Sequence, residues 1–340
     1  MVFVFATLAI NTAVAYLLDE ARPRLRDPEY ARRISCLRQR VAENPNRPLV
    51  LVVGSSRTAM GIKPGEWEIG RTAKANDFLL FNLSLIGGGP VLELIVTERA
   101  IADGIKPAGL LLEYWPPLLN VDRDNTSLSM LDRLGTRERS VMQEHYADPD
   151  LASGSYECSR LNPIYASRHR LLSQLFPKWI PTGHRLDWMW NDIDEWGWKP
   201  GCDFKPGTSE SRTILVNQAK GVFERLFADF QIDYQQERAI RETVSLAREK
   251  GIEVGFIYMP ESSEFRGWYP PAVEQTARQH FARITQELGV VVIDARTWIN
   301  DELFSDGFHL TRIGAAEFTL KLCPAIDAAF PSLKGYSIRH

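Results

Sequence analysis

The stretch PLVLVVGSSRTAMG, residues 48–61, places a continuous apolar run directly before a glycine, two serines and an arginine. A valine-rich run of this kind is typical of a strand buried on both faces of a parallel sheet. Such sheets bind their ligands beyond the carboxyl ends of the strands, which is where Ser55 and Ser56 would lie. Serine is also a common helix cap. We expect both roles here: the two serines open a helix, and Ser56 is a candidate nucleophile.

Four further apolar runs predict the rest of a sheet. They are FLLFNLS (78–84), AGLLLEYW (108–115), GIEVGFIYMP (251–260) and GVVVIDA (289–295). Segments with apolar residues at helical spacing lie between most of them. A last helix is expected from about Arg312, with Thr311 as its N-cap. Strands that alternate with helices predict an α/β fold whose parallel sheet is covered on both sides.

The segment from about 116 to 215 does not follow this alternation, and we expect a long insertion after the third strand. Within it, LDWMWNDIDEWGWKPG (186–201) holds four of the nine tryptophans of the chain. We expect these rings to form the packed core of the insertion. A lid, a surface on which sugars stack and a lipid contact are the alternatives.

The first eighteen residues, MVFVFATLAINTAVAYLL, carry no charged side chain. Because this length is close to the minimum for a helix that crosses a bilayer, we expect a membrane anchor over 1–18. Two alternatives stay open. Ala13-Val14-Ala15 resembles a signal-peptide cleavage site, although no basic segment precedes it, and a buried helix would have the same composition. Residues 19–47 are charged, and we expect them to form a stalk before a domain over 48–335.

Composition argues against several classes of function. The 340 residues carry a formal net charge of −3 without a basic run, which argues against a nucleic-acid-binding surface. None of the four cysteines belongs to a CxxC pair, so we expect no metal site, and we predict no cofactor. Cys158 and Cys202 could pair in an exported domain, but their spacing alone does not decide this.

A second polar motif lies near the carboxyl end, in SDGFHLTRIGAAEF (305–318). It places Asp306 three residues before His309, in a loop that follows the fifth predicted strand. A serine hydroxyl becomes a useful nucleophile when an imidazole takes its proton and a carboxylate orients that imidazole. In a parallel sheet this loop and Ser56 would share the carboxyl edge. We therefore predict a catalytic triad of Ser56, His309 and Asp306.

These motifs resemble the sequence blocks of the SGNH (GDSL-type) hydrolase superfamily. Its first block, Gly-x-Ser, matches Gly54-Ser55-Ser56, its second matches Asn82 and Gly87, and its last, Asp-x-x-His, matches Asp306 and His309. The resemblance implies a flavodoxin-like three-layer fold with Ser56 as nucleophile. It also implies an oxyanion hole formed by Ser56 and Gly87, together with Asn82.

The third block of that family, Gly-x-Asn-Asp, is absent. The corresponding position holds Glu113-Tyr114-Trp115-Pro116, so one oxyanion donor is unaccounted for. The loss of one such donor costs on the order of 10²–10³ in rate. Asn120 or a residue of the insertion would have to replace it, or the activity is low or of another kind.

The chain is also similar to one branch of that family, the membrane-anchored SGNH-like proteins that work with membrane-bound O-acyltransferases. This implies an acyl ester donor, a glycan acceptor, a partner acyltransferase and an extracytoplasmic domain, although the arginines after residue 18 favour the cytoplasmic side. We expect an esterase or an O-acyltransferase. The alternative is a non-catalytic, membrane-tethered scaffold that binds a glycan or a partner acyltransferase.

Three further charged residues are candidates for substrate binding. Arg57 directly follows the predicted nucleophile, and Glu261 and Arg266 follow the fourth predicted strand. Each has a structural alternative: Arg57 could pair with a carboxylate such as Glu113, and Glu261 with Arg266 could form an ion pair within a loop.

Overall fold

The computed structural model describes residues 2–70, 78–121, 133–145, 154, 157–159, 161–201, 209–331 and 333. The chain divides into two compact units. The first contains residues 1–32 and 122–192, and the second contains residues 33–121 and 193–340. The predicted insertion therefore contributes to both units, and so do residues 19–47, which we expected to form a stalk.

The second unit is built on a five-stranded parallel sheet with the strand order β2-β1-β3-β4-β5. Its strands are β1 (Leu49–Val53), β2 (Leu79–Asn82), β3 (Gly109–Glu113), β4 (Glu253–Tyr258) and β5 (Val291–Asp294). This is the flavodoxin-like order, in which the chain switches direction beside β1. The predicted α/β fold is confirmed, and so are all five predicted strands.

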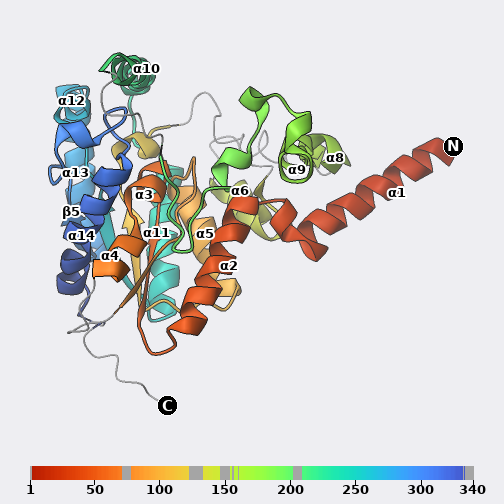
Figure 1. The fold of residues 1–340 in the computed structure, drawn as a ribbon, viewed down its shortest axis with the longest axis horizontal. Coiled ribbons are helices and arrows are strands. Elements are labelled where there is room, and N and C mark those ends of the chain that lie inside the picture. The colour runs from red at the N-terminus through yellow and green to blue at the C-terminus, as the bar shows by residue number, and fades with distance from the viewer. Residues whose placement is uncertain are drawn as a thin grey trace. The chain divides into compact units, whose positions relative to one another are not determined.

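Helices cover both faces of this sheet (Figure 1). On one face α14 (Arg312–Ala329) packs against α3 (Ser56–Gly61) and α4 (Pro64–Gly70). On the other, α5 (Pro90–Ala102) packs against α11 (Tyr234–Glu249). Right-handed crossovers from β1 to β2 and from β2 to β3 put their helices on opposite faces, because β1 lies between β2 and β3. Other long helices of this unit are α10 (Ser209–Ala228), α13 (Pro271–Leu288) and most of α2 (Pro28–Glu43).

Three of the strands are fully buried, as their unbroken apolar runs predict. The burial of β1, β2 and β3 is complete along their lengths, whereas β5 at the edge is partly exposed. At the opposite edge, the N–H of Asn82 in β2 donates to the carbonyl of Trp196 at 3.1 Å. Trp198 is buried, and its indole N–H donates to the carbonyl of Met60 at 2.6 Å. Trp198 is therefore part of the hydrophobic core of the second unit, whereas Trp196 is half-buried and covers the β2 edge through its backbone carbonyl.

The first unit is helical. Its elements include α1 (Val2–Tyr16), α6 (Arg139–His145), α8 (Pro163–Ala166) and α9 (Arg168–Leu175), and the first turns of α2 (Pro28–Glu43) belong to it. A buried arginine ties its two chain segments together: Arg133 donates to Asp27 at 2.9 Å and to Glu29 at 3.0 Å. Residues 19–32 therefore hold buried ion pairs.

The prediction of a membrane anchor over 1–18 is corrected by the structure. The apolar helix there, α1, has 15 residues and continues into a π-helix over Leu17–Ala21 that carries Asp19 and Glu20. Across the described part of the chain, no helix combines the length and the apolar character needed to cross a membrane. The possible pairing of Cys158 with Cys202 involves Cys202, which lies outside the described residues.

Candidate active site

The candidate nucleophile lies in the turn that joins β1 to α3. Ser55 is the N-cap of α3, and its hydroxyl accepts a hydrogen bond from the N–H of Arg57 at 3.1 Å. Ser56 is the first residue of the helix and is half-buried, whereas Ser55 is buried. The two serines thus differ in their contacts: Ser55 caps the helix, and the hydroxyl of Ser56 points to another partner.

That partner is the imidazole of His309. Oγ of Ser56 lies 2.8 Å from Nε2 of His309, and Nδ1 of the same ring lies 2.7 Å from Oδ2 of Asp306. With Nδ1–H donating to the carboxylate, Nε2 keeps a lone pair that accepts from the Ser56 hydroxyl. The structure therefore brings together the three residues that the sequence singled out, in the order hydroxyl, imidazole and carboxylate.

A tight turn before α14 holds the acidic residue and the histidine. Oδ1 of Asp306 accepts hydrogen bonds from the backbone N–H groups of Phe308 and His309, at 3.1 and 2.8 Å. Gly307 adopts a φ of 99°, a conformation that side chains with a Cβ rarely take. One oxygen of Asp306 thus fixes the turn, and the other orients the imidazole.

These contacts also set the charge of Asp306. Burial alone would raise the pKa of its carboxyl group. The charge of His309 and the hydrogen bonds from His309 and Phe308 outweigh burial and hold the pKa below the ordinary value of an aspartate. The carboxylate form is therefore favoured, as is required to orient the imidazole and to stabilise its protonated form.

Gly87 lies in an exposed turn beside the Ser56 turn. Its φ is 75°, and the N–H of Leu85 in the same turn donates to the carbonyl of Gly54 at 3.1 Å. The turns are so close that a Cβ on Gly88 would lie 2.6 Å from the carbonyl oxygen of Gly54. The two backbone N–H groups predicted for the oxyanion hole, those of Ser56 and Gly87, thus belong to adjacent turns at one edge of the sheet.

The structure does not place the amide of Asn82 in an oxyanion hole. This side chain is fully buried, and its Nδ2 donates to the carbonyls of Thr58 at 2.7 Å and Ile62 at 2.8 Å. Its Oδ1 accepts from the N–H of Ser84 at 3.2 Å. The amide hydrogens are therefore already used to satisfy the last carbonyls of α3, which corrects the predicted role.

Two of the three candidate substrate-binding residues are sealed from solvent. Arg57 is 1% exposed and Glu261 is 0% exposed, which excludes contact with a bound molecule. Arg266 is half-buried, and its guanidinium donates to the carbonyls of Glu261 and Arg296. Glu261 pairs with Arg296 at 3.0 Å and not with Arg266. Arg57 contacts Glu113, which is the structural alternative that the sequence offered. The partner of Glu261 was not expected, because Arg296 follows β5 and lies 35 positions further on.

One buried residue of the site was not predicted as functional. Glu113 ends β3, and its Oε2 accepts from the N–H of Ser55 at 2.7 Å. The sequence signal that could have identified Glu113 is a carboxylate at the end of an otherwise apolar run.

Asn120 was a candidate to replace the missing asparagine of the oxyanion hole. Its side chain instead donates to the carbonyl of Leu226 at 3.1 Å and accepts from the N–H of Gln231 at 2.8 Å.

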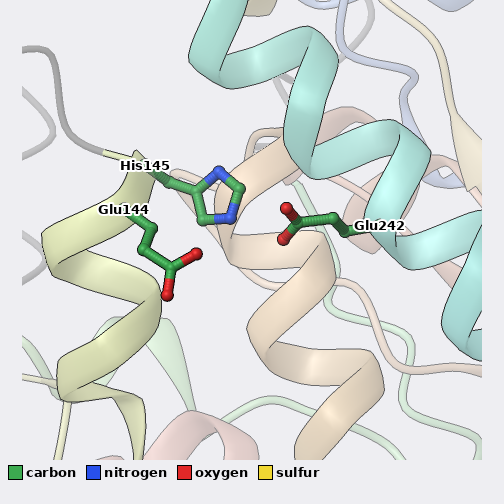
Figure 2. A group of neighbouring side chains, drawn as sticks. All are labelled: Glu144, His145 and Glu242. Atoms are coloured by element: carbon green, nitrogen blue, oxygen red, sulfur yellow. The ribbon is translucent and has the colours of Figure 1, made fainter.

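Glutamate and histidine side chains can bind metal ions. Glu144 and His145 form the last turn of α6 in the first unit, and Figure 2 shows both side chains. The third residue drawn there, Glu242, belongs to α11 of the second unit, so the three are not combined into a site. Within either unit taken alone, the described residues contain no group of three possible metal-ligating side chains.

Comparisons with known proteins add little to this geometry. No protein-family profile and no curated protein matches the sequence. Among solved structures, the chain is similar to a crystal structure of a candidate acylhydrolase from Bacteroides fragilis, with 11% identity and a TM-score of 0.38. The match covers 86% of this chain and 96% of the other. A likeness this distant carries no conclusion about activity.

Proposed function

We propose that this protein catalyses ester hydrolysis or acyl transfer through a covalent intermediate on Ser56. The observation that carries the proposal is the unbroken chain of hydrogen bonds from Ser56 through His309 to Asp306, at 2.8 and 2.7 Å. Hydroxyl, imidazole and carboxylate in this order form the arrangement that activates a serine.

In the first half of the reaction, Oγ of Ser56 attacks the carbonyl carbon of an ester while Nε2 of His309 takes the hydroxyl proton. Asp306 holds the imidazole in one tautomer and stabilises the imidazolium that forms. The carbonyl oxygen becomes an oxyanion, for which we assign the backbone N–H groups of Ser56 and Gly87 as donors. The C–O bond to the leaving alcohol then breaks, and the alcohol takes the proton back from His309.

In the second half, a water or another hydroxyl attacks the acyl-enzyme. His309 takes the proton of the attacking group and returns it to Oγ of Ser56 when the acyl bond breaks. Water as acceptor makes the protein an esterase, and a sugar hydroxyl makes it an O-acyltransferase. The family resemblance favours a glycan as acceptor, an acyl ester as donor and an acyltransferase as partner, and these assignments stay part of the proposal.

A fluorophosphonate probe tests the activated serine directly, because it reacts with nucleophilic serines irrespective of their natural substrate. We expect the purified protein to be labelled and the Ser56→Ala variant not to be. Ser55→Ala is the matched control: it removes the neighbouring hydroxyl, which caps α3, and should leave labelling at Ser56 detectable.

Absence of labelling in a folded protein would contradict the proposal. It would favour the alternative function, a non-catalytic scaffold that binds a glycan or a partner acyltransferase, which the missing third sequence block suggests. Labelling that persists in Ser56→Ala would show that another residue reacts, and would equally overturn the assignment.

A further inference from the structure

Buried charges lie beneath the candidate site. Glu113, Arg57, Glu261 and Arg296 follow one another at the carboxyl edge of the sheet. They come from the ends of β3, the Ser56 turn after β1, the exit of β4 and the exit of β5. The side chains of Arg57, Glu113 and Glu261 have no exposed surface. Charges so completely removed from water persist only when they are paired.

Arg57 is the centre of this network. Its Nη2 donates to the carbonyls of Met259 and Pro260, at 3.1 and 2.9 Å. Its guanidinium also lies between two carboxylates, 3.5 Å from Glu113 and 3.7 Å from Glu261. A planar guanidinium can hold several acceptors in fixed directions, which a lysine cannot. Arg57 thus ties the Ser56 turn to the exit of β4 by two hydrogen bonds and to the end of β3 by an ion-pair contact without a hydrogen bond.

Glu113 carries this restraint to the nucleophile turn. Its Oε2 accepts from the N–H of Ser55 at 2.7 Å and from the hydroxyl of Thr58 at 3.3 Å. A Cβ on Gly54 would lie 2.6 Å from the Cβ of Glu113, so the turn packs directly on this side chain. The residues on both sides of Ser56 are therefore held by one buried pair, Arg57 with Glu113.

Three contacts extend the restraint to the turn that holds the histidine. Ser262, next to Glu261, donates its N–H to the carbonyl of Gly307 at 3.0 Å. The guanidinium of Arg57 stacks over the ring of Trp115, 4.3 Å from its centroid. Trp115 in turn stacks on Phe308, with 5.6 Å between ring centroids. Gly307 and Phe308 both belong to the turn that presents His309.

From these contacts we propose that Arg57 is a positioning residue: it holds the Ser56 turn and the His309 turn in register, with Glu113 as its buried counter-ion. The inference rests on the proposed function, since it assigns a residue to the same reaction. It accounts for a charged residue that follows the nucleophile directly and yet is sealed from substrate. A displacement of about 1 Å between reacting groups can cost a factor on the order of 10² in rate.

The test compares Arg57→Met with a matched control, Arg47→Met. Arg47 is also a largely buried arginine, paired with Glu68 at 2.6 Å and bonded to the carbonyl of Phe78 at 2.7 Å, but it precedes β1 and lies at the amino end of the sheet. Both variants should melt at a lower temperature than the wild type. At a temperature where all are folded, we expect Arg57→Met to react with the fluorophosphonate about 10- to 100-fold more slowly and Arg47→Met to react at the wild-type rate.

Steady-state hydrolysis of p-nitrophenyl acetate separates positioning from binding. Arg57→Met should lower kcat and leave KM unchanged, because Arg57 does not touch substrate. Glu113→Gln should have a smaller effect, since the amide oxygen still accepts from Ser55. The double variant Arg57→Met/Glu113→Gln should be more stable than Arg57→Met alone, because it leaves no unpaired carboxylate at Glu113. A wild-type kcat in folded Arg57→Met would overturn the inference.

A crystal structure of Arg57→Met tests the same point without any activity. We expect Oγ of Ser56 and Nε2 of His309 to separate beyond about 3.5 Å, outside hydrogen-bond reach. A distance that stays at 2.8 Å would overturn the inference, whatever the activity of the protein. A wild type that does not react with the probe would instead contradict the proposed function, and the two failures are thus distinguishable.

Discussion

Oγ of Ser56 lies 2.8 Å from Nε2 of His309, although 253 positions separate the two residues in the sequence. Ser56 follows β1, and His309 follows β5, which is three strands away in the sheet. At the usual strand spacing this is about 14 Å. The chain covers that distance because the segment after β5 crosses the carboxyl edge before α14, which packs against α3. The site thus depends on α14 being docked beside α3.

Asp306→Asn tests the role of the carboxylate. An amide cannot hold the imidazole in the tautomer that accepts from Ser56, so we expect kcat for p-nitrophenyl acetate to fall on the order of 10³–10⁴-fold, with little change in KM. Glu317→Gln is the control, since this carboxylate lies in α14 and pairs only with Lys321 at 2.7 Å among the contacts described. An Asp306→Asn enzyme that retains a tenth of the wild-type rate would contradict the triad.

The same carboxyl group should contribute to stability in a pH-dependent manner. Its pKa is lowered in the folded protein, so the unfolded state binds more protons in the acidic range. The contribution is therefore present above the unfolded pKa of about 4 and is lost as the pH falls through the lower, folded value. Melting temperatures from pH 7 to pH 3 should fall less steeply in Asp306→Asn than in the wild type. Parallel curves would show that Asp306 is not held as described.

Gly54→Ala tests the close packing under the nucleophile turn. A Cβ at this position would lie 2.5 Å from Oγ1 of Thr58 and 2.6 Å from the Cβ of Glu113. Since both neighbours are buried, we expect a loss of about 1–3 kcal/mol in the free energy of unfolding, together with slower probe labelling.

Gly221→Ala is the matched control for that substitution. Gly221 lies in α10, and a Cβ there would meet no atom within 4 Å. Alanine should stabilise this helix by up to about 1 kcal/mol and leave labelling unchanged. If Gly54→Ala were as well tolerated as Gly221→Ala, the Ser56 turn would not be fixed by its contact with Glu113.

The sequence predicts those parts of the fold that local patterns determine. The apolar runs at 48–54 and 251–260 correspond to β1 and β4, and Thr311 is the N-cap of α14, as expected. Long-range pairing is not visible in such patterns. The contact of Arg57 with Glu113 is the structural alternative that the sequence offered, but its second carboxylate, Glu261, lies 204 positions further on and was not expected as its partner.

The same limitation applies to the amino-terminal segment. Residues 1–32 form a unit with residues 122–192, which no composition shift along the chain indicates. The apolar character of residues 1–18 predicted a membrane anchor. Near the limiting length, hydropathy alone does not distinguish a membrane-spanning helix from a shorter apolar helix. The charged residues after that segment depend on a distant partner in the same way. Asp27 and Glu29 are buried because they pair with Arg133, which lies more than a hundred positions further along the chain.

Asn82→Ala separates a structural role from an oxyanion role. The variant leaves the carbonyls of Thr58 and Ile62, which accept from Nδ2 at 2.7 and 2.8 Å, without this donor. We expect it to lower the free energy of unfolding by about 1–3 kcal/mol. Below its melting temperature, the labelling rate should fall less than tenfold, whereas the loss of an oxyanion donor costs on the order of 10²–10³. A rate loss of that size in a folded, stable variant would return Asn82 to the oxyanion hole and contradict the geometry described.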